Sequence, residues 1–175
     1  MVCGLFLLAA CSDPKPAREP AVKPAAVQPA PVSQPASQIV QSLPLGQRLA
    51  RESDLHPSAR RHAENLLSHF HQNGVTLLRI KQVLAETLGA DYCASSVSTS
   101  GIGVVVCEFG DATAAERGLK ISHDTFDRIL PGRTLLVQRS TMVTVTKPAS
   151  DAARLELVRL RDLFSQPLPG ARASL

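Results

Sequence analysis

Residues 92–109, YCASSVSTSGIGVVVCEF, predict two β-strands joined by a tight turn. Gly101 supplies the left-handed backbone that the last residue of a three-residue hairpin loop requires. Centring this hairpin on Ser100 places Cys93 directly opposite Cys107. Opposed Cβ atoms in such a pair lie about 4.5–5.5 Å apart, so a disulfide needs only a modest local adjustment. The loop glycine and the cysteine positions therefore predict the same register.

The sequence contains four cysteines. Cys3 and Cys11 belong to the N-terminal segment, which leaves Cys93 and Cys107 to the folded part. Closing a loop of about 15 residues contributes roughly 3 kcal/mol in the chain-entropy model. A metal site or a redox pair is the alternative, but neither cysteine has the CxxC spacing that would support it. We predict a structural disulfide between Cys93 and Cys107, in a compartment that permits oxidation.

Helical periodicity is present on both sides of the hairpin. Pro57 suits the first turn of a helix and Asp111 suits an N-cap. Pro44 and Gly46 interrupt residues 39–56, so we predict no helix there. The predicted helices span about 57–73, 76–88, 112–130 and 151–166.

Residues 134–138 and 142–147 predict a second hairpin. When it is centred on Ser140, four apolar side chains share one face, as a one-sided sheet requires: Leu135, Val137, Val143 and Val145. The predicted fold class is α+β, with the element order α-α-β-β-α-β-β-α. We expect a four-stranded, mostly antiparallel sheet with helices on one face, preceded by a helical hairpin.

The αββαββ part of this order, with its Pro131-Gly132 turn, resembles the BON domain. That domain is an envelope module that is often tethered to lipid. The resemblance lies in the order of the elements rather than in a specific motif. It implies contact with phospholipid or with a cell-wall polymer.

The N-terminal residues Val2–Ala10 form an apolar run. A transmembrane helix needs about 20 residues, whereas this run has the length of a signal-peptide core. It ends in Leu8-Ala9-Ala10-Cys11, which resembles the lipobox of bacterial lipoprotein precursors. The resemblance implies a diacylglyceryl group on the sulfur of Cys11, cleavage before Cys11 and an anchored mature chain. Ser12 favours the outer over the inner membrane, and the lack of a basic residue before the run indicates a start upstream.

Seven prolines lie between Ser12 and Ser37. Such a segment disfavours helix and lacks apolar bulk to bury, so we expect an extended spacer. The predicted organisation is a signal peptide at 1–10, a lipidated cysteine and disordered tether at 11–38, one α+β domain at 39–166 and a loose tail at 167–175.

The charge and the motifs exclude several classes of function. The formal net charge of +4 arises from interspersed Lys and Arg, whereas nucleic-acid binders usually carry a basic stripe. No HExxH, P-loop, GxGxxG or GxSxG is present. His62 and His69 lie about 10.5 Å apart along a helix, too far to share a metal ion. We therefore predict no catalytic, cofactor-binding or metal-binding residues, and expect Glu108 to face solvent or pair with an arginine.

The sequence thus predicts a lipid-anchored protein of the cell envelope, held in the membrane through Cys11 and facing the periplasm or the cell surface. We expect a non-catalytic binding or structural module whose partner is another envelope protein. One alternative is an enzyme or ligand-binding module whose site residues are scattered along the chain. The other is a BON-like module that contacts phospholipid or cell wall. The sequence identifies no small-molecule ligand.

Overall fold

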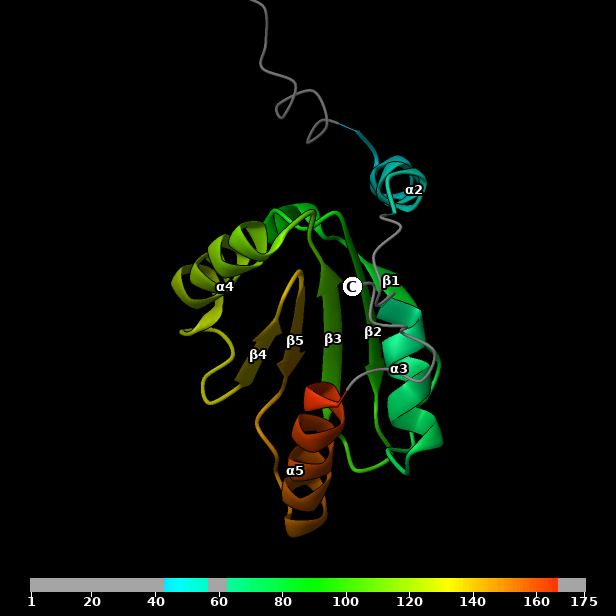
Figure 1. The fold of residues 1–175 in the computed structure, drawn as a ribbon, viewed down its shortest axis with the longest axis vertical. Coiled ribbons are helices and arrows are strands. Elements are labelled where there is room, and N and C mark those ends of the chain that lie inside the picture. The colour runs from blue at the N-terminus through cyan, green and yellow to red at the C-terminus, as the bar shows by residue number, and fades with distance from the viewer. Residues whose placement is uncertain (1–42, 57–62, 167–175) are drawn as a thin grey trace, which may run out of the picture. The chain divides into compact units, whose positions relative to one another are not determined.

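The computed structural model describes residues 43–56 and 63–166, and its centre is a five-stranded antiparallel sheet with the order β1-β2-β3-β5-β4 (Figure 1). The strands are β1 (Lys81–Val83), β2 (Tyr92–Val97), β3 (Gly103–Glu108), β4 (Thr134–Gln138) and β5 (Thr141–Val145). The helices are α2 (Leu45–Asp54), α3 (Ala63–Gln72), α4 (Ala112–Phe126) and α5 (Asp151–Ser165), with a 3₁₀ turn, η1 (Glu86–Leu88). The predicted α+β class is confirmed, and the sheet has one more strand than predicted.

The first hairpin has the predicted register, with Cys93 opposite Cys107. In its loop, the N–H of Ser98 donates to the carbonyl of Ile102, and Gly101 has a φ of 86°. Hydrogen-bonded and non-hydrogen-bonded pairs alternate along an antiparallel ladder. Counting from Ser98, the cysteine pair is therefore of the non-hydrogen-bonded kind, in which the two residues lie closer together. Their Cα atoms are 4.1 Å apart.

Helices cover both faces of the sheet, which corrects the prediction that they pack on one face. Helices α3 and α5 pack over one set of alternating strand residues: Ala94, Val104, Val106, Val143 and Val145. Helix α4 packs over the other set, which includes Cys93, Cys107 and Met142. Successive side chains of a strand point to opposite faces. Because both sets are apolar here, each face needs a cover.

The second hairpin differs from its predicted register by one residue. Its loop consists of Arg139 and Ser140, and Arg139 has a φ of 53°, as two-residue hairpin loops require. A shift of one residue moves a side chain to the other face of a sheet. Of the four side chains predicted to share a face, Leu135 and Val137 lie on the α4 face, whereas Val143 and Val145 lie on the opposite face.

The prediction of a helix over 76–88 is wrong. Leu77 forms a bridge with Ser98, and the chain continues into β1, which pairs with β2. The apolar spacing of this stretch is compatible with a helix. However, the outer edge of β2 offers backbone groups that need partners, and the N–H of Leu78 donates to the carbonyl of Val97 at 2.8 Å. Tertiary pairing therefore overrides the local pattern.

Helix α2 forms where the sequence predicts none. Pro44 precedes it, and its carbonyl accepts the N–H of Gln47 at 2.9 Å and that of Arg48 at 3.1 Å. Proline is tolerated at the start of a helix, where its missing N–H has no intrahelical partner. Gly46 lies in the first turn, so it does not interrupt the helix.

The remaining helices lie where they were predicted, but α4 ends at Phe126 rather than near residue 130. Asp111 caps α4 by accepting the N–H of Ala114 at 2.6 Å, and Ser150 caps α5 by accepting that of Ala153 at 3.1 Å. Pro57, at the predicted start of the first helix, lies outside the described residues. Within 43–56 and 63–166, no helix combines the length and the apolar character that crossing a membrane requires.

Candidate functional site

The structure contains a disulfide between Cys93 and Cys107, which is consistent with the predicted pairing. Both residues are buried on the face that α4 covers. A buried sulfur is shielded from thiols in solution, which suits a structural rather than an exchanging bond. Cys11, the predicted site of lipidation, lies outside the described residues.

Glu108 lies at the end of β3 and is 0 % exposed. The expectation that its side chain faces solvent is therefore wrong. Glu108 continues the alternation of Val104 and Val106, so its side chain points to the face covered by α3. Its Oε1 accepts a hydrogen bond from the backbone N–H of Ala63, the first residue of α3. A carboxylate is favourable at this position because a helix N-terminus carries unpaired N–H groups and a partial positive charge.

Among the residues that the structure describes, three further polar side chains lie near Glu108. Nε2 of His56 lies 3.3 Å from Oε1 of Glu108 and 4.0 Å from Oε2 of Glu64. The hydroxyl of Tyr92 donates to Oε1 of Glu64, and its ring stacks on the imidazole of His56 with centroids 4.0 Å apart and planes 20° apart. We call His56, Glu64, Tyr92 and Glu108 the polar cluster.

Burial and the carboxylates of Glu64 and Glu108 raise the pKa of Tyr92, and these carboxylates supply two possible metal ligands. Burial raises the pKa of Tyr92 above its usual range, and the hydrogen bond to Glu64 and the charges of nearby glutamates add to this shift. The phenol therefore stays protonated and acts as a donor. The imidazole of His56 and the carboxylates of Glu64 and Glu108 each present an atom that can bind a metal, and these atoms lie within 4.8 Å of one another.

Sequence reasoning missed this cluster because its members are far apart along the chain. Tyr92 and Glu108 are paired opposite each other across β2 and β3. Their proximity could therefore have been predicted from the hairpin register. His56 and Glu64 lie before the sheet, and no local spacing indicates their contact. Of the two histidines considered from the sequence, His69 is buried in α3 and His62 lies outside the described residues.

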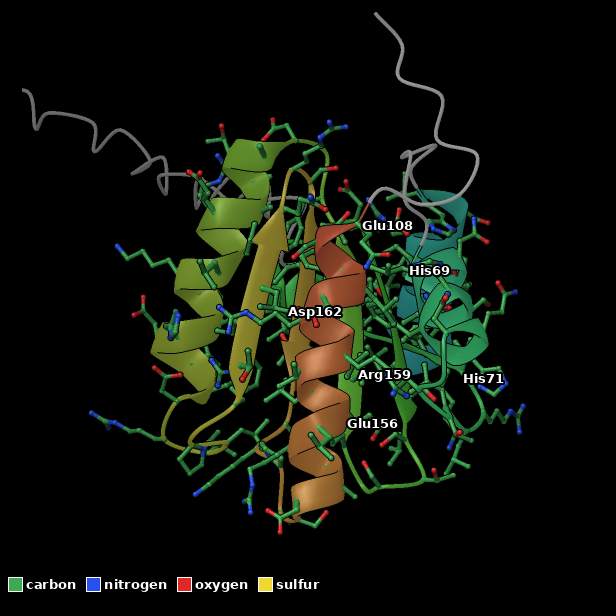
Figure 2. All side chains as sticks on the ribbon, turned by 60° about the horizontal axis from the view of Figure 1, so that its bottom comes forward. His69, His71, Glu108, Glu156, Arg159 and Asp162 are labelled. Atoms are coloured by element: carbon green, nitrogen blue, oxygen red, sulfur yellow. A yellow bond between two sulfur atoms is a disulfide. The ribbon has the colours of Figure 1, made fainter. Side chains whose placement is uncertain are left out.

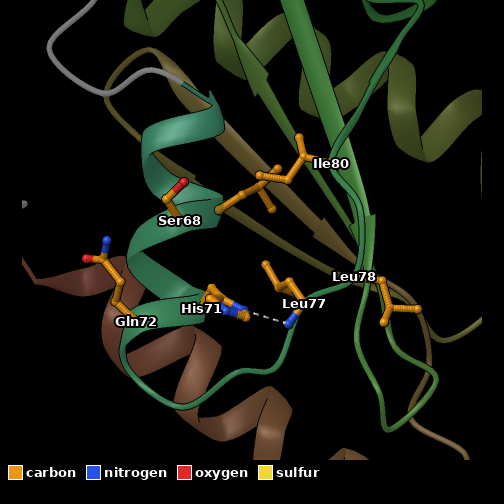
Figure 3. A pocket seen from close by; sticks show the side chains of 7 residues that line it. Ser68, His71, Gln72, Leu77, Leu78 and Ile80 are labelled. Atoms are coloured by element: carbon orange, nitrogen blue, oxygen red, sulfur yellow. Dashed lines mark hydrogen bonds between the residues drawn. The ribbon is translucent and has the colours of Figure 1, made fainter.

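A groove of about 400 Å³ lies between α3 and the extended segment before β1 (Figure 3). Its lining is mainly apolar, with a few polar side chains: Leu67, Leu77, Leu78 and Ile80, together with Ser68, His71 and Gln72. Nδ1 of His71 accepts the N–H of Leu77 at 3.2 Å, which joins the two walls (Figure 3). We call this surface the α3 groove.

A second group of polar side chains lies at the other end of the β2–β3 hairpin. The hydroxyls of Ser98 and Ser100 donate to Oε2 of Glu156 on α5, the former at 2.7 Å. Figure 2 shows Glu156 and Glu108 at opposite ends of the sheet. Because Ser98 is buried and Glu156 accepts both hydroxyls, these contacts tie α5 to the hairpin loop.

Comparisons of this chain with protein-family models, with curated proteins and with solved structures find no significant match. Its function therefore has to be inferred from its own residues.

Proposed function

We propose that this chain is a lipoprotein of the bacterial cell envelope, anchored through Cys11, whose folded domain binds another envelope protein without catalysing a reaction. The support comes from three parts of the chain. Leu8-Ala9-Ala10-Cys11 matches a lipobox, the proline-rich stretch suits a spacer, and the domain carries a disulfide.

The disulfide between Cys93 and Cys107 is the observation that carries this proposal. Disulfides persist in exported proteins and are rare in the reducing cytosol. The bond joins the central strand of the sheet, β3, to its neighbour β2, so it belongs to the core of the fold. A domain built around such a bond suits the compartment to which a lipobox directs a protein.

The α3 groove is the surface that we assign to the partner. Leu78 is 57 % exposed at its edge, and an apolar groove with a few polar groups is the usual form of a recognition site. We expect the partner to present apolar side chains to Leu77, Leu78 and Ile80.

Metabolic labelling with palmitate tests the anchor, with the two N-terminal cysteines as a matched pair. We expect Cys11→Ala to abolish labelling and to release the protein from membranes. Cys3→Ala should leave both unchanged, because Cys3 lies within the apolar run. Labelling that persists in Cys11→Ala would refute the anchor.

Site-specific photocrosslinking in intact cells tests the partner. A photoreactive residue at Leu78 should capture a discrete envelope protein. The matched control is Leu155 on α5, which is 73 % exposed and lies outside the α3 groove. Equal capture at both positions, or no specific product at Leu78, would count against the groove as the binding surface.

The BON-like alternative has one observation in its favour. Leu155 and Val158 on α5 are both more than half exposed, and exposed apolar side chains can enter a lipid surface. Sedimentation of the Cys11→Ala protein with anionic liposomes tests it. Binding that is lost when both residues are changed to serine would favour this function over protein binding.

A further inference from the structure

We propose that His56, Glu64 and Glu108 form a binding site for a divalent transition-metal ion of the zinc type. Zinc is bound in proteins by histidine nitrogens and by carboxylate oxygens, and this set offers one nitrogen and two carboxylates. With a neutral imidazole, the three ligands carry a formal charge of −2, which a divalent ion neutralises. Magnesium and calcium prefer sets made of oxygen alone.

The spacing of the ligand atoms supports the assignment. Zinc binds such ligands at about 2.0–2.1 Å, so two ligands of a tetrahedral site lie about 3.3 Å apart. Nε2 of His56 is 3.3 Å from Oε1 of Glu108 and 4.0 Å from Oε2 of Glu64. The second distance is longer than a bound pair requires, so the Glu64 side chain, which is 39 % exposed, has to move closer to His56 when it binds the ion.

Neighbouring groups hold each ligand in place. The N–H of Ala63 donates to Glu108, and the hydroxyl of Tyr92 donates to Oε1 of Glu64, which leaves Oε2 on the side of His56. A carboxylate oxygen has two lone pairs, so Oε1 of Glu108 can accept the N–H and still bind a metal. The stacked ring of Tyr92 fixes the plane of the imidazole. Such supporting contacts orient ligands and strengthen metal binding.

The site is reachable by an ion from solution. Glu108 is fully buried and forms its floor, whereas the side chains of His56 and Glu64 are 26 % and 39 % exposed. Three protein ligands leave a fourth tetrahedral position for water or for an added ligand. The site lies at the N-terminus of α3, so the ion would also join this helix to β3.

Titration of the full chain with Zn²⁺, followed by calorimetry, tests the site. The chain should carry Cys3→Ala and Cys11→Ala, which remove competing thiols, and no histidine tag. We expect one ion per chain, with His56→Gln and Glu64→Gln each weakening binding about tenfold or more. Tyr92→Phe keeps the stacked ring and removes the donor to Glu64, so it should also weaken binding. Mg²⁺ and Ca²⁺ should not compete.

His123→Gln is the matched control. His123 forms an exposed pair with Asp127 at 3.0 Å. This change should not alter the affinity. The inference is overturned if Zn²⁺ does not bind, if the control weakens binding as much as the ligand variants do, or if all three variants of the polar cluster bind normally. Circular dichroism identifies any variant that does not fold, and the remaining ones then decide the outcome.

Discussion

Gly118 lies in the middle of α4, where the helix passes over the buried ring of Phe109. A Cβ at this position would lie 2.4 Å from Phe109 ring atoms and 3.2 Å from the carbonyl of Leu88. Alanine normally stabilises a helix interior by up to about 1 kcal/mol relative to glycine. Here the forced repacking costs about 1–3 kcal/mol. We therefore expect Gly118→Ala to lower the free energy of unfolding in urea.

Gly46→Ala is the matched control for that substitution. Gly46 also lies in a helix, α2, and a Cβ there meets no atom within 4 Å. Its substitution should leave the free energy of unfolding unchanged or raise it by up to about 1 kcal/mol. If both substitutions changed the free energy of unfolding equally, the contact with Phe109 would not be the reason that position 118 requires glycine.

Asp91, just before β2, makes the stability depend on pH. Burial, and to a smaller extent the charge of Asp111, raise the pKa of Asp91 above its ordinary value of 3.8. The folded protein then binds this proton more tightly than the unfolded chain does, so stability falls as the pH rises through the raised pKa. Asp91→Asn should therefore raise the free energy of unfolding at pH 7, and this gain should vanish below pH 3.8.

Urea unfolding at pH 7 and at acid pH measures that dependence. Asp124→Asn serves as the control, because Asp124 is an exposed carboxylate of α4. Surface substitutions of this kind usually change stability by less than about 0.5 kcal/mol. A gain in Asp91→Asn that persists undiminished below pH 3.8 would contradict the assignment.

At the scale of whole elements, the sequence predicts well where a local signal and a tertiary contact agree. The β2–β3 register follows from Gly101 and the cysteine positions, and the N-cap Asp111 lies where it was expected. The segment that became β1 shows the opposite case. Its apolar spacing suits a helix, but the segment pairs with the edge of β2 instead. No local pattern in the sequence indicates that this edge lies beside it.

The candidate site was less predictable than the fold for a related reason. Its ligands come from the segment before α3, from α3 itself and from β3. Each residue alone has an ordinary explanation as a surface side chain. The alternation of β3 could have indicated that Glu108 shares a face with Val106, and hence that it is buried. The partners of Glu108 come from the packing of α3 on that face, and this tertiary contact cannot be predicted from a local sequence pattern.

Helix α2 is held against the sheet mainly by polar contacts, which makes its docking sensitive to one residue. Oε1 of the buried Glu52 accepts the N–H of Ala85 at 2.9 Å and that of Glu86 at 3.0 Å. Leu45 and Leu55, in contrast, are more than half exposed. We expect Glu52→Ala to destabilise this contact by about 1–3 kcal/mol, because it leaves two backbone donors without their acceptor.

Amide hydrogen exchange measures this effect locally. The amides of Ala85 and Glu86 should exchange faster in Glu52→Ala, whereas amides of β3 should keep their protection, since α2 can open without unfolding the sheet. Glu116→Ala, at an exposed position of α4, should change neither. Unaltered exchange at Ala85 in Glu52→Ala would show that α2 is held by other contacts.

At the scale of the whole molecule, the disulfide between β2 and β3 contributes to stability and supports the proposed location in an oxidising compartment. Cys93 and Cys107 are separated by 14 positions, and a closed loop of this size contributes about 3 kcal/mol by constraining the unfolded chain. Domains are stable by only about 5–15 kcal/mol. Loss of the bond is therefore expected to remove a large fraction of the stability.

The double variant Cys93→Ala/Cys107→Ala should unfold at a lower urea concentration, and its m-value should rise because the unfolded chain is no longer restrained. Reduction of the unchanged protein should produce a similar loss. Mass spectrometry of unreduced protein from the envelope should find no free thiol at either position. Free thiols at both positions would rule out the bond, and with it the main support for the proposed location outside the cytosol. A bond that is present in cells but contributes little stability would not contradict the proposed location. It would show that the paired strands hold the hairpin without the bond.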